Sequence, residues 1–207
     1  MQISVAIKSC HKHHARRQAQ LDTWLPQLQA DYFFIIGNPR LVMPDTLSCD
    51  VSDRFEDIAP KILCACLSML DANVDFGFFC DDDTYVRPDR LLGSNFRQHD
   101  YVGFVRPYGD TSTGGLPYIQ GSAYWLSARA MEHIARAGAT MRPGIIDDGA
   151  VGMALDGKVA LTHNRLYWPG PEPFIRPLLD NDIISTHKCL PPMMQQVHQP
   201  FAGARRG

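Results

Sequence analysis

The chain has 207 residues, of which 45% are hydrophobic and 20% are charged, and its formal net charge is −2. This length and apolar content predict one globular domain with a hydrophobic core. The charge is close to neutral and no long basic run occurs, which argues against nucleic acid or an anionic membrane surface as the main partner.

The composition also bears on the compartment. No stretch approaches the ~18 consecutive apolar residues of a transmembrane helix. The first seven residues contain no basic run that leads into a long apolar segment, so we expect no signal peptide. The six cysteines include no Cys-x-x-Cys pair, and we expect them to be reduced and mostly buried. Together these features predict a cytoplasmic protein.

Strand and helix patterns alternate along the chain. Strands are predicted at 3–7, 31–38, 76–80, 101–105, 118–126, 159–162 and 183–187. Helices are predicted at 15–28, 61–70, 88–92, 127–137 and 150–155, with Pro26 leaving the end of the first one open. The alternation predicts an α/β sandwich. We expect residues 1–190 to form a single domain and residues 191–207 to be a mobile tail.

Three consecutive carboxylates, Asp81, Asp82 and Asp83, follow the apolar run at 76–80. Adjacent Asp side chains repel one another, so a folded chain keeps them close mainly when a cation or solvent relieves that repulsion. Ligands of α/β sheets gather at the carboxyl ends of strands. The triplet therefore favours a divalent-metal site slightly over the alternative, a solvated acidic turn.

Asp147 and Asp148 form a second acidic pair, before the helix predicted at 150–155. The chain lacks the Gly-rich motifs of dinucleotide and P-loop sites and the Gly-x-Ser-x-Gly elbow. A phosphate ligand would therefore need a metal and charged side chains. The candidates are the Asp triplet, Lys61, Arg16, Arg17 and His187. Oxygen ligands with one imidazole suit Mn²⁺, with Mg²⁺ as the weaker alternative.

Six sequence blocks follow one another in order. They are 15–24 (ARRQAQLDTW), 53–61 (DRFEDIAPK), 81–86 (DDDTYV) with Leu91 and Leu92, 118–127 (YIQGSAYWLS), 147–152 (DDGAVG) and 185–187 (STH). Over nearly the whole chain, they resemble the motifs of the Fringe and β1,3-galactosyltransferase type of glycosyltransferase. Gln20, Ala123 and Gly149 depart from the family pattern, where Arg, Gly and Val are usual. These departures lie near the expected substrates, so the identity of the substrates stays open.

The resemblance implies the GT-A fold, a Rossmann-like three-layer α/β/α sandwich with a central mixed, mostly parallel sheet. It also implies an inverting, metal-dependent glycosyltransferase. Such an enzyme moves a sugar from a nucleotide-diphosphate donor, here a UDP-sugar, to a hydroxyl of a glycan or glycolipid acceptor. The family name points to a β1,3 linkage.

The resemblance also assigns roles to single residues. Asp83 and His187 would bind Mn²⁺, with Asp81 as a further ligand or as a partner of the ribose or sugar hydroxyls. Asp82 would bridge toward the ribose or the metal, and Asp148 would be the general base, with Asp147 as the alternative. The nucleotide end would be lined by Arg16, Arg17 and Lys61, with Gly121 allowing close backbone approach.

Several alternatives stay open at this point. The fold can serve as a non-catalytic module that binds a sugar nucleotide or a glycan, and paired carboxylates also serve metal-dependent phosphoryl or nucleotidyl transfer. Tyr118, Tyr124 and Trp125 can stack on a sugar, although such residues in a strand are more often core. The Trp168-Pro-Gly-Pro segment is a candidate edge of the acceptor site.

Overall fold

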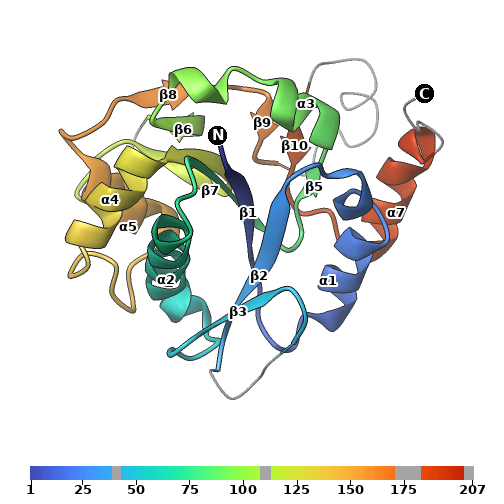
Figure 1. Cartoon of the computed structure of the whole chain (residues 1–207), viewed down its shortest axis with the longest axis horizontal. Helices are drawn as coiled ribbons and strands as arrows, with labels where there is room; N and C mark the ends of the chain where they lie inside the picture. The colour runs from blue at the N-terminus through green and yellow to red at the C-terminus, as the bar shows by residue number, and fades with distance from the viewer. Residues whose placement is uncertain (39–42, 108–112, 171–182, 203–207) are drawn as a thin grey trace.

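A seven-stranded sheet runs through the centre of the molecule (Figure 1). The computed structural model describes residues 1–38, 43–107, 113–170 and 183–202. The strands are β1 (Ile3–Lys8), β2 (Asp31–Gly37), β3 (Thr46–Cys49), β4 (Phe76–Asp81), β6 (Tyr101–Arg106), β7 (Tyr118–Ser127) and β8 (Leu161–His163). Their order is β3-β2-β1-β4-β7-β6-β8. Strand β7 is antiparallel to both neighbours and the other pairs are parallel, which confirms a mixed, mostly parallel sheet.

Helices cover both faces of the sheet, so the predicted α/β/α sandwich is confirmed. They are α1 (His14–Leu21), α2 (Ile58–Asp71), α3 (Pro88–Gly93), α4 (Ala128–Arg136), α5 (Asp147–Leu155) and α7 (Pro191–His198). Figure 1 shows α2, α4 and α5 on one side of the sheet and α1 and α7 on the other. Strand residues alternate between the two layers: Val5 and Ile7 pack on the α1 side, and Ala6 packs on the α2 side.

Two aromatic residues of β7, Tyr124 and Trp125, belong to the core, whereas Tyr118 at the start of the strand is only partly buried. The Trp125 ring stacks on Phe96 at 3.8 Å between centroids, and its indole N–H donates to the hydroxyl of Tyr167 at 3.1 Å. On the opposite face, Tyr124 stacks on Phe79 at 5.3 Å. Both β7 side chains are fully buried. They stabilise the sheet and are not available to stack on a sugar.

A second, three-stranded sheet brings the late part of the chain to the end of β4. Its order is β5 (Tyr85–Val86), β10 (Ser185–Thr186) and β9 (Tyr167–Trp168). Strand β10 is shorter than the strand predicted at 183–187 and lies outside the large sheet. Because β5 follows the Asp triplet directly, its pairing with β10 places His187 beside that triplet.

The first helix is shorter than predicted. It ends at Leu21, and the chain then turns into a single 3-10 turn, η1 (Leu25–Gln27). Two features explain the early end. The hydroxyl of Thr23 donates to the carbonyl oxygen of Ala19 at 2.6 Å, and Pro26, which has no N–H to donate, is compatible only with the start of a new turn.

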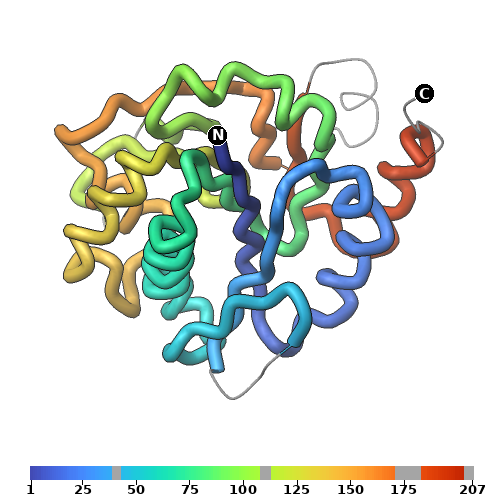
Figure 2. Tube along the Cα trace, in the orientation of Figure 1, coloured from blue at the N-terminus to red at the C-terminus, as the bar shows by residue number. Residues whose placement is uncertain are grey.

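The prediction of a mobile tail is wrong for the described part of that segment. Residues Pro191–His198 form α7, followed by the 3-10 turn η5 (Gln199–Phe201). Met194 and Val197 are fully buried, because α7 packs against α1 from the other end of the chain (Figure 2). Burial of two large apolar side chains holds this helix in place. Residues 203–207 lie outside the described residues.

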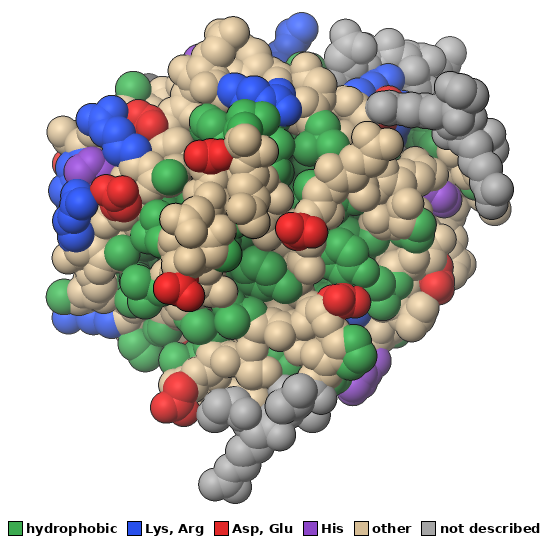
Figure 3. Space-filling view, in the orientation of Figure 1, with side chains coloured by type: hydrophobic (Ala, Val, Ile, Leu, Met, Phe, Trp, Pro, Cys, Tyr) green, Lys and Arg blue, Asp and Glu red, His purple; other side chains and the backbone are tan. Residues whose placement is uncertain are grey.

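The surface agrees with the near-neutral charge. On the face shown in Figure 3, hydrophobic side chains occupy much of the centre, and Lys and Arg gather mostly toward the left and upper margins. This face therefore carries no broad basic surface of the kind that nucleic acid requires. None of the helices in the described ranges combines the length and the apolar character needed to cross a bilayer.

Candidate active site

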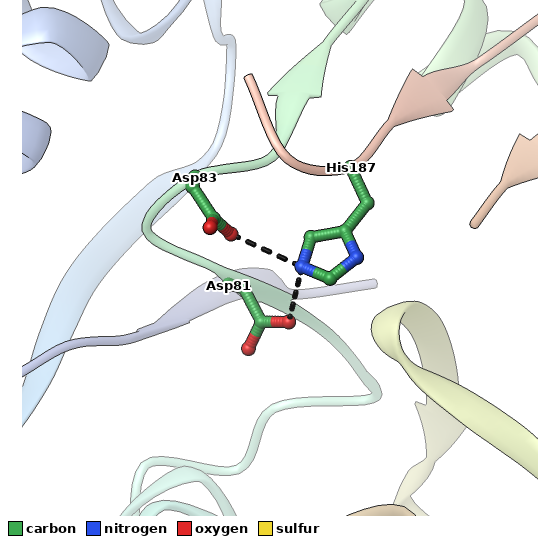
Figure 4. A group of neighbouring side chains, drawn as sticks. All are labelled: Asp81, Asp83 and His187. Atoms are coloured by element: carbon green, nitrogen blue, oxygen red, sulfur yellow. Dashed lines mark ion pairs between the residues drawn. The ribbon is translucent and has the colours of Figure 1, made fainter. Parts of the chain in front are cut away.

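Asp81, Asp83 and His187 converge at the carboxyl end of β4 (Figure 4). The chain turns directly after this strand, with the N–H of Thr84 donating to the carbonyl oxygen of Asp81 at 3.1 Å. The Nε2 atom of His187 lies 3.3 Å from an Asp81 oxygen and 3.1 Å from an Asp83 oxygen. One ligand atom from each of the three residues falls within a 4.8 Å span, as a shared cation requires. Two carboxylates and one imidazole are a donor set that fits Mn²⁺.

Backbone contacts hold His187 in this position. The backbone N–H of His187 donates to the carbonyl oxygen of Trp168 at 3.3 Å. Its ring atom Nδ1 lies 3.4 Å from the carbonyl oxygen of Pro169. Nδ1 thus faces the backbone while Nε2 faces the carboxylates, the orientation expected of a metal-binding His. His187 therefore bonds to backbone on one side and faces the candidate metal site on the other.

The two carboxylates differ in electrostatic environment. Burial alone would raise the pKa of Asp83, but the hydrogen bond and charge of His187 and the charge of Arg16 lower it. For Asp81, burial and the charge of Asp147 raise the pKa despite Lys8 and His187. Burial lowers the pKa of His187, yet Asp83 and Asp81 outweigh it and the pKa lies above the ordinary value. Asp83 is thus the more readily ionised of the two candidate ligands.

Lys8 links this acidic group to the second one. Its ammonium is 2.9 Å from Asp81, 2.6 Å from Asp147 and 2.8 Å from the carbonyl oxygen of Gly121. Three acceptors match the three N–H donors of an ammonium. The side chain is only 5% exposed, and the two carboxylates raise its pKa against the opposing effect of burial. The bridge therefore holds a positive charge between the two acidic groups.

Asp147 and Asp148 have different partners although they are adjacent. Asp147 is 8% exposed and is bound to Lys8. Asp148 accepts the N–H of Gly121 at 3.2 Å and that of Gly149 at 2.9 Å, and is less buried. Burial and the charge of Asp147 raise the pKa of Asp148 to about 6. The carboxylate of Asp148 is thus able to exchange a proton near neutral pH. Helix α5 begins at this pair.

An irregularity in β7 brings Gly121 to the same place. From the pair Gly103↔Tyr124 to the pair Val105↔Ile119, the chain advances by two residues in β6 but by five residues in β7. The extra residues bulge from the sheet, as strands often do beside active sites. A Cβ at Gly121 would lie 2.9 Å from Asp147 Oδ2 and 3.0 Å from Lys8 Nζ. The close approach predicted for this glycine is thus toward the acidic residues of its own chain.

Asp82 is held by several partners. Its oxygens contact the hydroxyl of Ser9 at 2.7 Å, Nδ1 of His13 at 2.7 Å and the guanidinium of Arg16 at 3.0 Å. The residue is 3% exposed. The same guanidinium reaches Asp83 at 3.3 Å. Asp82 therefore joins the His-rich segment after β1 to the strand end, and Arg16 sits between the triplet and solvent.

Lys61 and Arg17 were both predicted at the nucleotide end. Both side chains are buried, but they bind different partners. Lys61 pairs with Asp53 at 2.5 Å and donates to the carbonyl oxygen of Ser9 at 3.1 Å. Burial would raise the pKa of Asp53, but Lys61 and the N–H groups bonded to it bring that pKa down to about 2. The guanidinium of Arg17 donates to the Ser9 hydroxyl and to the carbonyl oxygen of Cys10. Arg17 thus braces the segment after β1.

A cavity of about 400 Å³ opens beside these residues. It is lined by three stretches of chain around β1, the start of α2 and the end of β4, together with His187. The lining residues are Lys8, Ser9, Cys10, His13, Arg16, Asp53, Arg54, Phe55, Ile58, Lys61, Asp81, Asp82, Asp83 and His187. Arg17 is not among them. The volume suits a small charged ligand.

Comparison with known proteins places this geometry in context. A solved structure, that of a glycosyltransferase involved in the glycosylation of the major capsid of PBCV-1, superposes with a TM-score of 0.61. The match covers 96% of this chain and 100% of that chain, at 10% sequence identity. The fold of this chain is thus similar to that of this glycosyltransferase. No protein-family model and no curated protein matches the chain. The Fringe and β1,3-galactosyltransferase resemblance stays a prediction.

Several residues that connect the candidate site were not predicted from the sequence. Lys8, Ser9, His13 and Asp53 were not among the predicted site residues. Lys8 directly follows the strand predicted at 3–7, and a charged residue at the carboxyl end of a strand is a signal that could have identified it. Asp53 gave a weaker signal, because acidic residues in loops are common.

Proposed function

We propose that this chain is an inverting, metal-dependent glycosyltransferase that uses a nucleotide-diphosphate sugar, most simply a UDP-sugar. The observation that supports this most directly is the convergence of Asp81, Asp83 and His187 beside a charged cavity, in a glycosyltransferase fold. The acceptor is a hydroxyl of a glycan or glycolipid, and the family resemblance points to a β1,3 linkage.

Asp83 and His187 would hold Mn²⁺, with Asp81 as the third ligand and Mg²⁺ as the alternative ion. When bound, the cation supplies Lewis-acid stabilisation for the charge of the departing nucleoside diphosphate. Arg16 lies next to Asp83 and is 30% exposed on its side chain, so it can contact a phosphate at the cavity mouth. Lys61 neutralises Asp53 in the cavity wall. The contact between the nucleotide and Lys61 is therefore indirect.

Asp148 is the proposed general base. The acceptor hydroxyl attacks the anomeric carbon, its proton passes to the Asp148 carboxylate, and the bond to the diphosphate breaks on the opposite side. This displacement inverts the anomeric configuration. A base works best when its pKa lies near the working pH, and the pKa of Asp148 is about 6. Asp147 suits the role less well, because Lys8 occupies its Oδ2.

The proposal is tested by following donor turnover with UDP-, GDP- and TDP-sugars in the presence of Mn²⁺, Mg²⁺ or a chelator. We expect release of a nucleoside diphosphate that depends on the metal, and a loss of on the order of 100-fold in Asp83→Ala. If Asp83→Ala left nucleotide binding and turnover unchanged, the metal assignment would be wrong.

The products separate the two alternatives. A nucleotidyl or phosphoryl transferase would break a bond within the diphosphate and release a nucleoside monophosphate or a sugar phosphate. A binding module would bind a sugar nucleotide, measured by calorimetry, without any turnover. Either result would contradict the proposed transfer reaction.

A further inference from the structure

An aromatic cluster lies at the strand ends next to the candidate active site. We call Phe104 of β6, His163 of β8 and Trp168 of β9 the aromatic platform. The Phe104 ring contacts His163 at 5.1 Å and Trp168 at 6.4 Å between centroids, edge to face in both cases. Phe104 and Trp168 are half-buried and His163 is exposed, in contrast to the fully buried Trp125 and Tyr124. The platform is therefore at the surface.

The platform borders the proposed metal site. Strands β4 and β6 point the same way, because both are antiparallel to β7, so Phe104 and Asp81 lie at the same edge of the sheet. Two strand spacings, about 10 Å, separate β6 from β4. On the other side, Trp168 pairs with Thr186 in β9 and β10, and its carbonyl oxygen accepts the N–H of His187.

Polar groups surround the aromatic rings. The guanidinium of Arg106 lies 5.6 Å from the centroid of Phe104, and its Nε donates to the side chain of Gln120 at 2.9 Å. Gln120 directly precedes Gly121, whose N–H donates to Asp148. A ligand on the platform would thus lie between the proposed base on one side and His187 on the other.

We propose that the aromatic platform binds the sugar ring of the acceptor. A pyranose has a C–H face that packs on aromatic rings and a rim of hydroxyls that need hydrogen-bond partners, which Arg106, Gln120 and His163 offer. Partly exposed aromatic residues with a polar surround also characterise a binding surface more than a core. This inference rests on the proposed function, because it assigns the acceptor subsite of that reaction.

A binding experiment tests the platform without donor or metal. The chain contains 3 tryptophans, of which Trp24 and Trp125 are fully buried, so acrylamide quenching of fluorescence reports mainly on Trp168. The probes are the methyl glycosides of galactose, glucose, N-acetylglucosamine, N-acetylgalactosamine, mannose and fucose. We expect at least one of them to protect Trp168 from quenching, and Phe104→Ala to abolish that protection. Failure of every glycoside to protect the wild-type protein would overturn the inference.

Kinetics with the protective glycoside as acceptor gives the second test. We expect Phe104→Ala and Trp168→Ala to raise the acceptor KM by roughly tenfold or more, with metal-dependent donor hydrolysis unchanged, and Trp168→Phe to retain most acceptor binding. Phe201→Ala is the matched control, because this half-buried aromatic residue also lies under a guanidinium, that of Arg87 at 3.7 Å.

The two proposals fail in different ways. The acceptor KM could stay unchanged in both Phe104→Ala and Trp168→Ala, with donor hydrolysis intact. That result would contradict acceptor binding by the platform and leave the proposed function standing. Loss of donor hydrolysis together with the acceptor effect would indicate a structural role for the rings and would also overturn the platform. Absence of donor turnover in the wild-type protein would instead contradict the proposed function, whatever the quenching shows.

Discussion

At the scale of single residues, two adjacent carboxylates have separate environments. Asp147 faces the ammonium of Lys8, whereas Asp148 faces backbone N–H groups and has a pKa raised to about 6. A carboxylate whose surroundings raise its pKa toward neutral is typical of an acid–base site, whereas one bound to a buried ammonium is typical of a structural ion pair. The consequences of replacing each carboxylate should therefore differ in kind.

Asp148→Asn should abolish most sugar transfer without loss of stability. Removal of a general base typically lowers the rate by about 10²–10⁴-fold. The variant also removes a charge that burial disfavours, so its free energy of unfolding at pH 7 should rise by about 1–2 kcal/mol. Transfer assays and urea unfolding test the two effects. Full transfer activity in this variant would place the base elsewhere.

Asp147→Asn, in contrast to Asp148→Asn, should mainly lower stability. The change takes one charged partner from a buried ammonium, and we expect it to cost up to about 3 kcal/mol of stability, because Asp81 still pairs with Lys8. Urea unfolding beside Asp148→Asn, a change of the same type one position along the chain, provides the matched comparison. Equal stability of the two variants would contradict the assigned contacts.

The pH dependence follows from the pKa of Asp148. As a base it must be ionised, so the transfer rate should fall about tenfold per pH unit below pH 6. The stability trend has the opposite sign. The folded pKa lies above the unfolded value, so the contribution of the protonated group is complete below pH about 4 and is lost as the pH rises through about 6. The stability advantage of Asp148→Asn should therefore grow over that interval, as measured by urea unfolding at each pH.

At the scale of elements, helix α7 is the clearest departure from the expectation drawn from sequence. The position of residues 191–207 at the end of the chain suggested a mobile tail, but Pro191 suits a helix start, where no N–H is required. The apolar residues Met194 and Val197 are three positions apart and therefore share one face, which packs on α1. Three apolar residues, Met193, Met194 and Val197, in an eight-residue segment are too short a pattern to distinguish a docked helix from a tail.

Truncation of a buried side chain in α7 tests this packing. We expect Met194→Ala to lower the free energy of unfolding by about 2–5 kcal/mol, the usual cost of emptying a core position. Leu190→Ala, at the start of the same helix, is the control, because Leu190 is 49% exposed and should cost less than about 0.5 kcal/mol. Similar, small effects for both would mean that α7 does not stabilise the fold.

Most strands were predicted from sequence and their pairing was not. Runs of apolar residues mark β1, β2, β4 and β6 within one or two positions, because buried strands are continuous apolar segments. Strands β9 and β10 are two residues long, and their place follows from contacts between segments far apart in the chain. Local pattern carries no information on such pairing.

At the scale of the whole molecule, a bound divalent cation should stabilise the entire fold. Its candidate ligands, Asp81, Asp83 and His187, come from two segments about 100 positions apart in the chain, so binding opposes separation of the small sheet from the large one. At a Mn²⁺ concentration of 100 times the dissociation constant, the free energy of unfolding should rise by about 2.7 kcal/mol and the melting temperature by roughly 5–11 °C. Calorimetry should show one transition that shifts with the metal, since we predict a single domain. Asp83→Ala should abolish the shift.

The candidate site, like the strands, could be predicted from the sequence only in part. The Asp triplet, His187 and the Asp147–Asp148 pair could be named, because acidic residues at strand ends and an ordered set of motifs mark them. Lys8 could not be weighed in the same way. Its importance comes from two carboxylates, those of Asp81 and Asp147, which are 73 and 139 positions away in sequence and become its neighbours only when β1, β4 and α5 are in place.

That separation of 139 positions bears on the order in which the chain folds. During synthesis, β1 emerges long before residue 147 exists, and at ~5–20 residues per second the ammonium of Lys8 waits at least several seconds for its second carboxylate. Until then, a lysine that is buried in the finished sheet has an incomplete set of acceptors. Strand β1, the neighbour of the middle strand β4, is thus made long before α5, and its lysine acquires the full set of acceptors only when α5 docks.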